Sequence, residues 1–450
     1  ILLKAMPHIS WPMRFVLPYH KNMRFDVNTP TSKLLNIFMP WLRGRRPAWL
    51  IRFGLFLYDN MGGRNFLKGT NSLSLINSPE GLPLKNKFSK AFEYSDCWIE
   101  DSRLVILNAR DAEIRGAKIN VRTKVTSAEQ IKGVWHLTLH SLRDDTSRVV
   151  TARMIVNAGG PWVEDIIQNK IRLNSSEGVR LVRGSHLITK KLYDHEKCYF
   201  FQGEDGRIIF AIPYETDFTL IGTTDVEHAD ISIKPECTLE EQNYLINFAS
   251  QYFKIKVTDD DIIKTYSGVR PLYNDNASSA SAATRDYVLS IDETLGAPML
   301  NVFGGKITTY RKLSENALDK ISKILPSVEV SWTAGIPLPG GNFDIKEVQD
   351  LKNKLLNKYT FLDQFWATRL LKAYGLDAFS ILGCSNLVED LGINFGATLT
   401  EKEVVWLIEK EYAQTADDII WRRSKLGLRL SNQEIKTLSK WVNINLTIIK

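Results

Sequence analysis

The chain has 450 residues, of which 44% are apolar and 24% are charged. This composition is ordinary for a globular protein of two or three domains, with ample material for a core. The four cysteines are scattered without a Cys-x-x-Cys pair, which argues against a metal or disulfide framework and fits a reducing compartment. No apolar run reaches the length of a transmembrane helix.

The net charge of +7 is concentrated at the start of the chain. Residues 1–70 hold eleven Lys/Arg against two Asp/Glu, a balance of +9, so the remainder carries −2. The same segment holds eleven aromatic residues. Basic residues mixed with Trp, Phe and Leu are typical of a surface that lies against anionic lipid. A nucleic-acid-binding surface and an ordinary basic surface with buried aromatics are the alternatives.

The first predicted elements lie within this basic segment. Residues 33–43 form a short amphipathic element. Residues 49–61 form a helix, in which Arg52 and Asp59 interrupt an otherwise apolar stretch. The pair Gly62-Gly63 ends this helix.

Sheet is predicted in two later regions, and helix at the end of the chain. Residues 117–156 alternate apolar and polar side chains, which predicts hairpin-like strands with one buried face. Residues 198–224 contain two more strands around the turn at 213–217. After a linker rich in Pro and Gly, residues 335–450 show mainly helical patterns and form a helical domain.

Two capping-box motifs mark helix starts in that domain. A Ser or Thr followed three residues later by Glu can satisfy the first amides of a helix in both directions. Thr400 with Glu403 and Ser431 with Glu434 both match this spacing.

Two segments combine an apolar strand, small residues and the start of a helix. Residues 153–156 run into Asn157-Ala158-Gly159-Gly160, and Pro161-Trp162 opens a helix. Residues 300–303 run into Gly304-Gly305-Lys306, followed by Thr308-Thr309. Small residues let backbone amides approach an anionic ligand, and a helix N-terminus favours phosphate. Each segment also fits a plain strand–helix turn, but two in one chain favour a dinucleotide cofactor.

Three side chains are candidates for substrate chemistry. Arg270 and Arg285 flank a loop rich in Asn, Ser and Ala, and paired guanidinium groups suit a phosphorylated substrate. His186 follows a glycine and a serine, and a histidine can accept an alcohol proton near neutral pH. Surface salt bridges for the arginines and a structural role for the histidine are the alternatives.

Eight short blocks stand out along the chain: residues 92–98, 156–162, 182–187, 221–225, 266–271, 284–287, 302–310 and 416–423. Each block alone is weak, but their joint order over nearly the whole chain is specific. Taken in this order, they resemble the respiratory, flavin-linked glycerol-3-phosphate dehydrogenases.

The resemblance implies a fold. The fold class is α/β with α+β character: an FAD-binding three-layer domain of the glutathione-reductase and amino-acid-oxidase type, interleaved with an antiparallel substrate-binding sheet. A C-terminal helical domain follows. By position in the family pattern, the expected substrate-binding parts are residues 1–100 and 163–265, the FAD-binding parts are residues 101–162 and 266–334, and the helical domain is 335–450.

The resemblance also implies a reaction and its residues. The reaction is oxidation of sn-glycerol 3-phosphate to dihydroxyacetone phosphate, with hydride transfer to FAD and reoxidation by membrane quinone. In the family pattern His186 accepts the proton, Arg270 and Arg285 bind the phosphate, and Lys306 stands near flavin and substrate. The expected flavin-lining residues are Val125, Asn157, Ala158, Gly159, Trp162, Gly304, Gly305, Thr308 and Thr309.

The chain departs from the family pattern at its start. The pattern opens with a strand, a Gly-x-Gly-x-x-Gly loop, a helix and an acidic ribose-binding residue, and continues to a Gly-Gly-x-Arg-Tyr block. The sequence begins after these features, so we expect the first βαβ unit to be missing and the 1–450 polypeptide to bind FAD poorly. Residues 23–44 resemble an insertion in a segment that is usually short.

The expected partners are glycerol 3-phosphate, membrane quinone and an anionic lipid surface, not nucleic acid, and a homodimer is one option for assembly. The expected location is cytoplasmic, peripheral on the inner membrane surface. Two alternatives stay open. One is another flavin oxidase of the amino-acid-oxidase type, and the other is a degenerate, non-catalytic binding protein.

Overall fold

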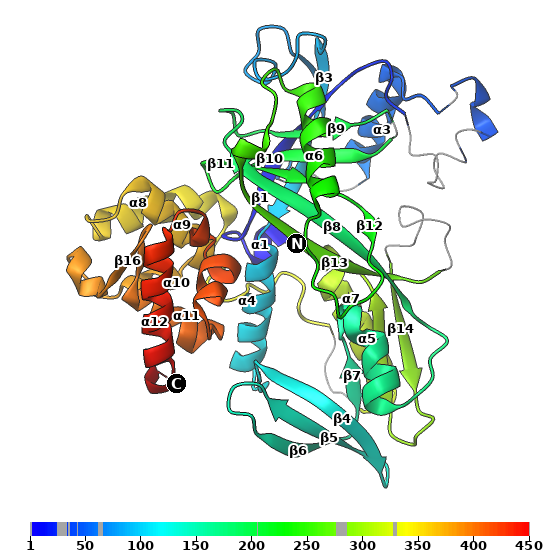
Figure 1. Ribbon diagram of the computed structural model, residues 1–450, viewed down its shortest axis with the longest axis vertical. Coiled ribbons are helices and arrows are strands. Elements are labelled where there is room, and N and C mark those ends of the chain that lie inside the picture. The colour runs from blue at the N-terminus through cyan, green and yellow to red at the C-terminus, as the bar shows by residue number, and fades with distance from the viewer. Residues whose placement is uncertain are drawn as a thin grey trace. The chain divides into compact units, whose positions relative to one another are not determined.

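The structure is a computed structural model, and it describes residues 2–24, 34, 37–42, 44–61, 66–204, 206–275, 286–326 and 331–449. The chain divides into two compact units, whose elements are labelled in Figure 1. The helical unit contains Ile1–Pro12, Cys97–Val121 and Val330–Lys450. The sheet unit contains Met13–Asp96 and Arg122–Glu329.

The largest sheet has nine described strands in the order β12-β8-β11-β10-β9-β1-β3-β2, and β13 also pairs with β8. The long strand β8 is antiparallel to β11, β12 and β13, whereas β1 runs parallel to β9. The strands are β1 Ser10–Pro18, β2 Asn71–Ser74, β3 Lys90–Ile99, β8 Val179–Lys190, β9 Cys198–Gln202, β10 Ile208–Tyr214, β11 Phe218–Gly222, β12 Val226–Glu227 and β13 Ile262–Tyr273. The turn predicted at 213–217 connects β10 and β11.

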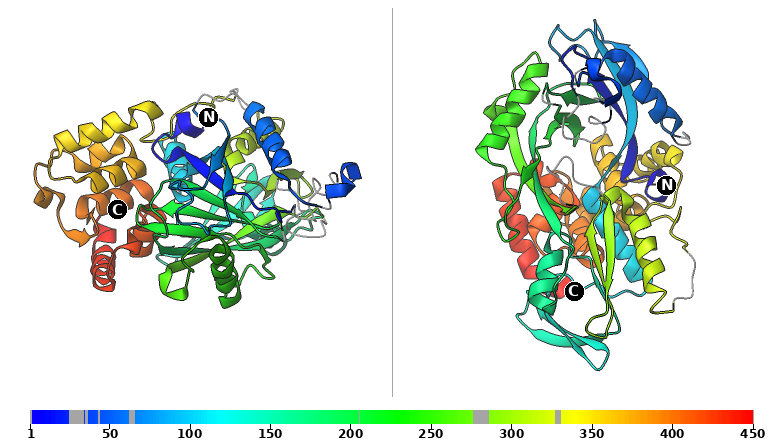
Figure 2. Two further views of the ribbon diagram at one scale, coloured as in Figure 1. Left: turned by 90° about the horizontal axis from the view of Figure 1, so that it is seen from above. Right: turned by 90° about the vertical axis from the view of Figure 1, so that its right-hand side faces the viewer.

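Helix α6, Leu239–Tyr252, covers one face of this sheet, as the left view of Figure 2 shows. The helix begins at Thr238, whose hydroxyl accepts from the Glu241 amide at 3.2 Å in a capping box. Its apolar side packs with β8, β9 and β10 in a core rich in aromatic rings, which includes Leu187, Tyr199, Phe201, Leu245, Phe248 and Tyr252. One face of β8 is therefore buried under α6, and the alternate side chains of β8 point to the other face.

Two smaller sheets share a second core in the sheet unit. In one, β7 and β15 are parallel and β14 is antiparallel to β15. The other is the antiparallel meander β4-β5-β6, which confirms the strands predicted from alternation at 117–156. Trp135 is 1% exposed and its Nε1 donates to the Pro298 carbonyl at 2.9 Å. The strands are β4 Thr123–Ile131, β5 Val134–Ser141, β6 Ser147–Ala152, β7 Ile155–Asn157, β14 Tyr287–Asp292 and β15 Met299–Gly304.

The helical unit has a leucine-rich core formed by residues 351–442. Two buried ion pairs cross it: Arg103 with Glu411, and Arg369 with Glu403 at 2.6 Å. Its helices are α1 Leu2–Ala5, α4 Asp101–Ile114, α8 Val348–Lys358, α9 Gln364–Tyr374, α10 Asp377–Leu382, α11 Glu401–Glu411 and α12 Asn432–Ile449. A short hairpin of β16 Asn394–Gly396 and β17 Leu399–Thr400 lies between α10 and α11.

Only one of the two predicted capping boxes in this unit forms. Ser431 and Glu434 exchange both hydrogen bonds before α12, which confirms the prediction there. Thr400 makes no side-chain cap at α11, so the second prediction is wrong. The Glu403 carboxylate pairs instead with Arg369 and accepts from the Tyr374 hydroxyl at 2.6 Å. A buried guanidinium is a stronger partner than a terminal amide.

Helix α3, Ala48–Asn60, agrees with the prediction at 49–61 and has an unusual orientation. Its polar side chains hold it on the sheet unit: Arg52 donates to Thr70 Oγ1 at 2.9 Å, and Asp59 accepts from the Thr70 amide at 3.0 Å. Ile51 is its one buried residue among those described. Three aromatic side chains of α3, those of Trp49, Phe53 and Phe56, are exposed, whereas the Tyr58 hydroxyl donates to the Ser95 carbonyl at 3.0 Å.

Candidate active site on the sheet face opposite α6

His186 lies in β8 on the sheet face opposite α6. Its register partners are Tyr266 in β13 and Gly222 in β11. The Tyr266 ring stacks on the imidazole with centroids 4.9 Å apart and an interplanar angle of 6°. A Cβ on Gly222 would lie 2.1 Å from His186 Cδ2, so only glycine at this position leaves room for the imidazole.

The imidazole of His186 is held in its neutral form. Its Nδ1 is buried and has no hydrogen-bond partner among the described residues. Burial, and then the charge of Arg270, lower the pKa of His186 to about 4. This differs from the expectation of a group that titrates near neutrality, because desolvation and a like charge both disfavour the imidazolium. A neutral imidazole can accept a proton throughout the physiological pH range.

Arg270 lies on the same sheet face as His186. Its guanidinium covers Gly184, where a Cβ would lie 2.6 Å from Arg270 Nη2. The Nη2 group donates to Thr223 Oγ1 at 3.2 Å, and Nη1 pairs with the Asp225 carboxylate. Because Gly184 and His186 are two residues apart in one strand, they are about 7 Å apart. A small molecule can therefore contact the guanidinium and the imidazole together.

The other two predicted substrate residues are Arg285 and Lys306. Arg285 lies outside the described residues. Lys306 is exposed and precedes the 3₁₀ helix η5, Ile307–Thr309, where its carbonyl accepts from the Thr309 amide at 3.0 Å and from Thr309 Oγ1 at 2.9 Å. The structure brings His186 and Arg270 together and places Lys306 at the turn after β15.

The two strand–glycine–helix segments form one edge. Strands β7 and β15 pair in parallel, with Asn157 opposite Asn301. Asn157 Nδ2 donates to Asn301 Oδ1 at 3.0 Å and to the Val163 carbonyl at 3.1 Å. Both strands end at the same edge and continue into helical turns, η2 Gly160–Trp162 and η5. This edge is where open α/β sheets bind nucleotides.

The backbone at this edge has a shape that lets a ligand approach it closely. Gly304 and Gly305 have φ values of +73° and +102°, which glycine adopts without strain. A Cβ on Gly304 would lie 2.9 Å from the Asp286 carbonyl oxygen and 3.1 Å from the Tyr273 amide nitrogen. The Gly159 amide donates to the Asn157 side chain at 3.3 Å. Because Tyr273 ends β13, this turn adjoins the strand that carries the substrate face.

Several residues predicted to line the flavin are accessible at this edge, whereas Asn157 is buried. Ala158 and Thr308 are exposed, and Trp162 is 53% exposed. Val156 is 48% exposed in β7, although parallel strands are usually covered on both faces. Apolar surface, hydroxyls and backbone amides at one edge fit a dinucleotide with a flat ring and charged phosphates. Val125 lies in β4, in the separate meander, and no described contact brings it to this edge.

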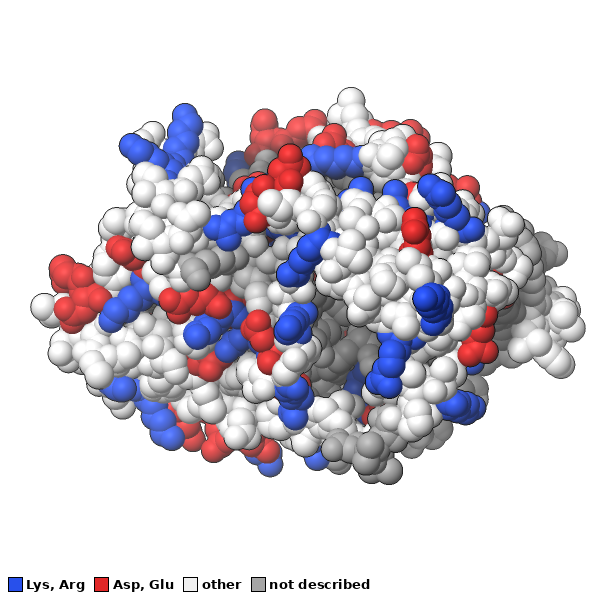
Figure 3. All heavy atoms as spheres, turned by 90° about the horizontal axis from the view of Figure 1, so that it is seen from below, with Lys and Arg blue, Asp and Glu red and all other residues white. Residues whose placement is uncertain are grey.

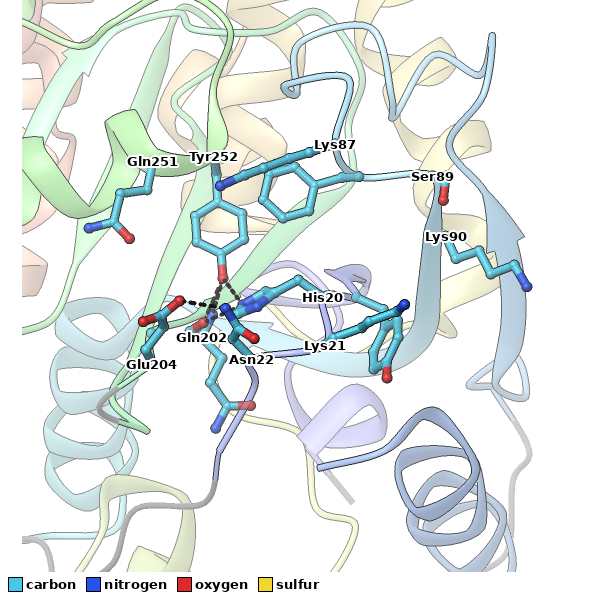
Figure 4. A pocket seen from close by; sticks show the side chains of 13 residues that line it. His20, Lys21, Asn22, Lys87, Ser89, Lys90, Gln202, Glu204, Gln251 and Tyr252 are labelled. Atoms are coloured by element: carbon cyan, nitrogen blue, oxygen red, sulfur yellow. Dashed lines mark hydrogen bonds between the residues drawn. The ribbon is translucent and has the colours of Figure 1, made fainter. Parts of the chain in front are cut away.

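A separate pocket of about 510 Å³ lies elsewhere in the sheet unit and contains none of these residues (Figure 4). Phe88 and Tyr252 stack in its wall with centroids 4.8 Å apart. His20 Nε2 lies 3.1 Å from the Tyr252 hydroxyl, which itself donates to the Gln202 carbonyl at 2.6 Å. The polar groups at its base therefore bond one another, and the pocket is not part of the site around His186.

Comparison with known proteins identifies the family. Residues 68–311 match the family described as FAD dependent oxidoreductase, and residues 331–445 match the C-terminal domain of alpha-glycerophosphate oxidase. A glycerol-3-phosphate dehydrogenase from Pseudomonas aeruginosa is 42% identical over 98% of this chain and 81% of its own length. The chain belongs to the family of FAD-dependent glycerol-3-phosphate dehydrogenases. The predictions of family, fold class and FAD as cofactor are confirmed.

Other relatives in this dehydrogenase family also match this chain over most of their length. An aerobic glycerol-3-phosphate dehydrogenase from Escherichia coli is 38% identical over 98% of this chain and 83% of its own. A D-erythritol 1-phosphate dehydrogenase from Brucella abortus is 42% identical over 99% and 85%. The fold matches the X-ray structure of a glycerol-3-phosphate dehydrogenase from Bacillus halodurans complexed with FAD, with a TM-score of 0.71 at 21% identity, over 100% of this chain and 84% of that one.

Sequence reasoning did not single out several residues of the substrate face. Tyr266, Gly222 and Gly184 shape the surroundings of His186 and Arg270, and Thr223 and Asp225 contact the guanidinium. All five lie inside the blocks that carried the family resemblance. Their roles depend on the register between strands far apart in the chain, which spacing alone does not reveal.

Proposed function

We propose that this protein oxidises sn-glycerol 3-phosphate to dihydroxyacetone phosphate with FAD as the hydride acceptor. The observation that carries the proposal is that the neutral, buried imidazole of His186 and the guanidinium of Arg270 lie on the same sheet face. Oxidation of a secondary alcohol needs a base for the hydroxyl proton, and a phosphate ester needs a cation. The names of the relatives at 42% and 38% identity support the same substrate.

Each residue has a role in this proposal. Arg270, together with Arg285, binds the phosphate, and the Thr223 hydroxyl orients the Arg270 guanidinium. His186 accepts the proton of the reacting hydroxyl on its ring nitrogen. Tyr266 stacks on the ring and fixes its plane. FAD, held at the ends of β7 and β15, supplies hydride acceptance, and Lys306 at that turn contributes positive charge beside it.

A second substrate has an observation in its favour. The relative named D-erythritol 1-phosphate dehydrogenase is 42% identical over 99% of this chain. Both substrates are phosphate monoesters of polyols, so the same guanidinium and base would serve either one. The chain length of the preferred polyol is therefore the point that an experiment has to decide.

The deciding experiment uses the protein expressed from its complete gene and loaded with FAD. Loss of flavin absorbance is followed without oxygen after mixing with sn-glycerol 3-phosphate, D-erythritol 1-phosphate, glycerol or erythritol. We expect fast bleaching with one phosphate ester and little with either free polyol. Equal rates for esters and free polyols would contradict the phosphate site, and no bleaching with any of them would contradict the proposed reaction.

We further propose that the protein acts on the inner membrane surface and passes electrons to quinone. Within the described part of the chain, no helix is long and apolar enough to cross a bilayer. Helix α3 is attached through Arg52 and Asp59, and Trp49, Phe53 and Phe56 are exposed on it. This arrangement is the reverse of a helix on a soluble core and suits burial in a lipid surface.

The rival interpretation of the basic charge, nucleic-acid binding, has less support. On the face drawn in Figure 3, the coloured Lys/Arg and Asp/Glu side chains are interspersed. Nucleic-acid binding requires a stripe or patch of positive charge. An apolar, aromatic helix face with few cations fits lipid better than phosphate backbone.

A further inference from the structure

A buried carboxylate lies behind the strand that carries His186. Glu241 is 5% exposed at the start of α6. Its Oε1 accepts from Ser185 Oγ at 2.8 Å and from Thr224 Oγ1 at 2.8 Å. Its Oε2 accepts from Arg183 Nη2 at 2.8 Å and from the Thr238 amide at 3.1 Å. One carboxylate therefore joins helix α6 to β8 and to the turn after β11.

These partners alternate with the residues of the substrate face. Ser185 directly precedes His186, and Thr224 directly follows Thr223, which contacts Arg270. Adjacent residues of a strand point to opposite faces, so Glu241 acts on the back of the segments whose fronts carry the imidazole and the guanidinium contact. The Ser185 amide also donates to Thr224 Oγ1 at 2.9 Å, which locks the two segments together.

The carboxylate is ionised and fully engaged. Burial opposes its charge, but hydrogen bonds from Thr238, Thr224, Ser185 and Arg183 outweigh burial and lower the pKa of Glu241 to about 2. A buried charge with this many donors fixes the positions of all of them, because any displacement leaves a charge or a donor unpaired.

We propose that Glu241 is a positioning residue for the reaction, and that it sets the placement of His186 relative to Arg270 from behind the sheet. The inference rests on the proposed roles of His186 and Arg270. It goes beyond a helix cap, because a capping box uses only the bonds between Glu241 and Thr238. The second oxygen, Oε1, accepts from the hydroxyls of Ser185 and Thr224 and, at 3.5 Å, from Arg183 Nε, none of which belongs to the cap.

Two variants test the strand side and one tests the cap. Glu241→Gln keeps the shape but loses the charge and one acceptor, and Thr224→Val keeps the shape but loses the hydroxyl. Thr238→Ala is the matched control, since it weakens the same helix start and leaves the Oε1 contacts in place. All are made in the protein expressed from its complete gene and loaded with FAD.

The first readout is flavin reduction at saturating substrate. We expect both strand-side variants to lose on the order of 10- to 100-fold in the reduction rate constant, because small misplacements of reacting groups have effects of this size. The reduction rate constant of Thr238→Ala should stay within about 2-fold of that of the parent, even where its melting temperature falls as much as those of the two strand-side variants. A loss in all three variants that follows melting temperature would overturn the inference.

The second readout does not need activity. The His186 imidazole resonance, assigned by its disappearance in His186→Gln, should shift in Glu241→Gln and Thr224→Val and stay in place in Thr238→Ala. An unmoved resonance in both strand-side variants would overturn the positioning role. A parent protein that no polyol phosphate reduces would instead contradict the proposed function, so the two failures are distinguishable.

Discussion

His186 and Arg270 owe their positions to glycines, which leave room for the two side chains on the sheet face. The imidazole occupies the position of a Cβ on Gly222, and the guanidinium occupies that of a Cβ on Gly184. Burial in the first case removes water from the ring, which keeps it neutral, whereas Arg270 stays 40% exposed in its side chain and remains open to a phosphate. The same sheet thus supplies a base and a cation side by side.

Arg270→Ala tests the phosphate contact. Loss of a charge-assisted hydrogen-bonded pair is expected to cost about 1.5–3 kcal/mol, or about 10- to 150-fold in kcat/KM for the phosphorylated substrate. Glycerol should lose less, since it has no phosphate. The measurement is steady-state kinetics with both substrates. An equal loss for both would show that Arg270 supports the fold rather than the phosphate.

His186→Gln tests the base. The amide can hydrogen-bond but cannot take the alcohol proton, so flavin reduction should slow by about 10²- to 10⁴-fold while substrate binding is largely kept. In the parent, protonation of the free His186 should lower kcat/KM only as pH drops through about 4, and any change near pH 6 belongs to the second ionisation of the substrate phosphate. The kcat profile should fall at a higher pH, because a bound phosphate offsets Arg270. Stopped-flow reduction across pH provides both profiles, and a variant as fast as the parent would remove His186 from the mechanism.

At the scale of elements, periodicity predicted what lies within one segment and missed what lies between segments. The alternation at 117–156 and the apolar run at 49–61 predicted a meander and a helix correctly. The capping spacing at Thr400 failed because Glu403 finds Arg369, a partner from another helix. No local pattern shows which of two competing partners a buried carboxylate will meet.

Helix α3 carries the prediction about membranes. Phe53 and Phe56 are 53% and 58% exposed, so changing both to Ser should leave the fold intact and remove about 1 kcal/mol of lipid binding per residue. Arg45→Gln should weaken binding to anionic vesicles only, by up to about 1 kcal/mol, and less at high salt. Co-sedimentation with anionic and neutral vesicles measures both effects. Unchanged binding of the double Phe variant would exclude α3 as the lipid contact.

The neighbouring arginines are not equivalent in this test. Arg43, Arg45 and Arg46 lie close together in the basic segment of residues 1–70, which is expected to face anionic lipid. Arg43 lies outside the described residues, and Arg45 is exposed. Arg46 is directed into the fold, where its Nη1 donates to Gln202 Oε1 at 2.6 Å. Its replacement is expected to lower stability rather than lipid affinity, so it serves as a negative control.

At the scale of the whole molecule, stability at acid pH depends on a buried histidine in the helical unit. His8 is 2% exposed, and neither of its ring nitrogens has a partner among the described residues. Burial, and then Arg103 and Arg110, lower the pKa of His8 to about 3. In the unfolded chain His8 therefore binds a proton below about pH 6.5, whereas in the folded chain it stays neutral down to about pH 3.

The consequence is a loss of stability as pH falls through this window, of up to about 1.4 kcal/mol per pH unit from this one group. His8→Leu should remove that share, so the variant and the parent should differ little at pH 7.5 and diverge in favour of the variant at pH 5. Urea unfolding at the two pH values measures the difference. Parallel changes in both proteins would show that His8 is not the group responsible.

The overall architecture could be predicted because the family blocks preserve their order along the whole chain. The family, the cofactor and the turns at Asn157 and Gly304 followed from short motifs, since a strand, small residues and a helix start are local features. The grouping of residues 1–12 and 97–121 with the helical unit did not follow, because it depends on contacts such as Arg103 with Glu411 across more than three hundred residues.

The close packing of His186 against Gly222 can be used to predict which homologous sequences encode active enzymes. Any side chain at the position of Gly222 would displace the imidazole, since its first carbon would overlap the ring. A homologous sequence that keeps the histidine but carries alanine or a larger residue at that position is therefore expected to encode a protein that cannot hold its base in place. The residues at the positions of His186 and Gly222 would then separate catalytic members of the family from inactive ones by sequence alone.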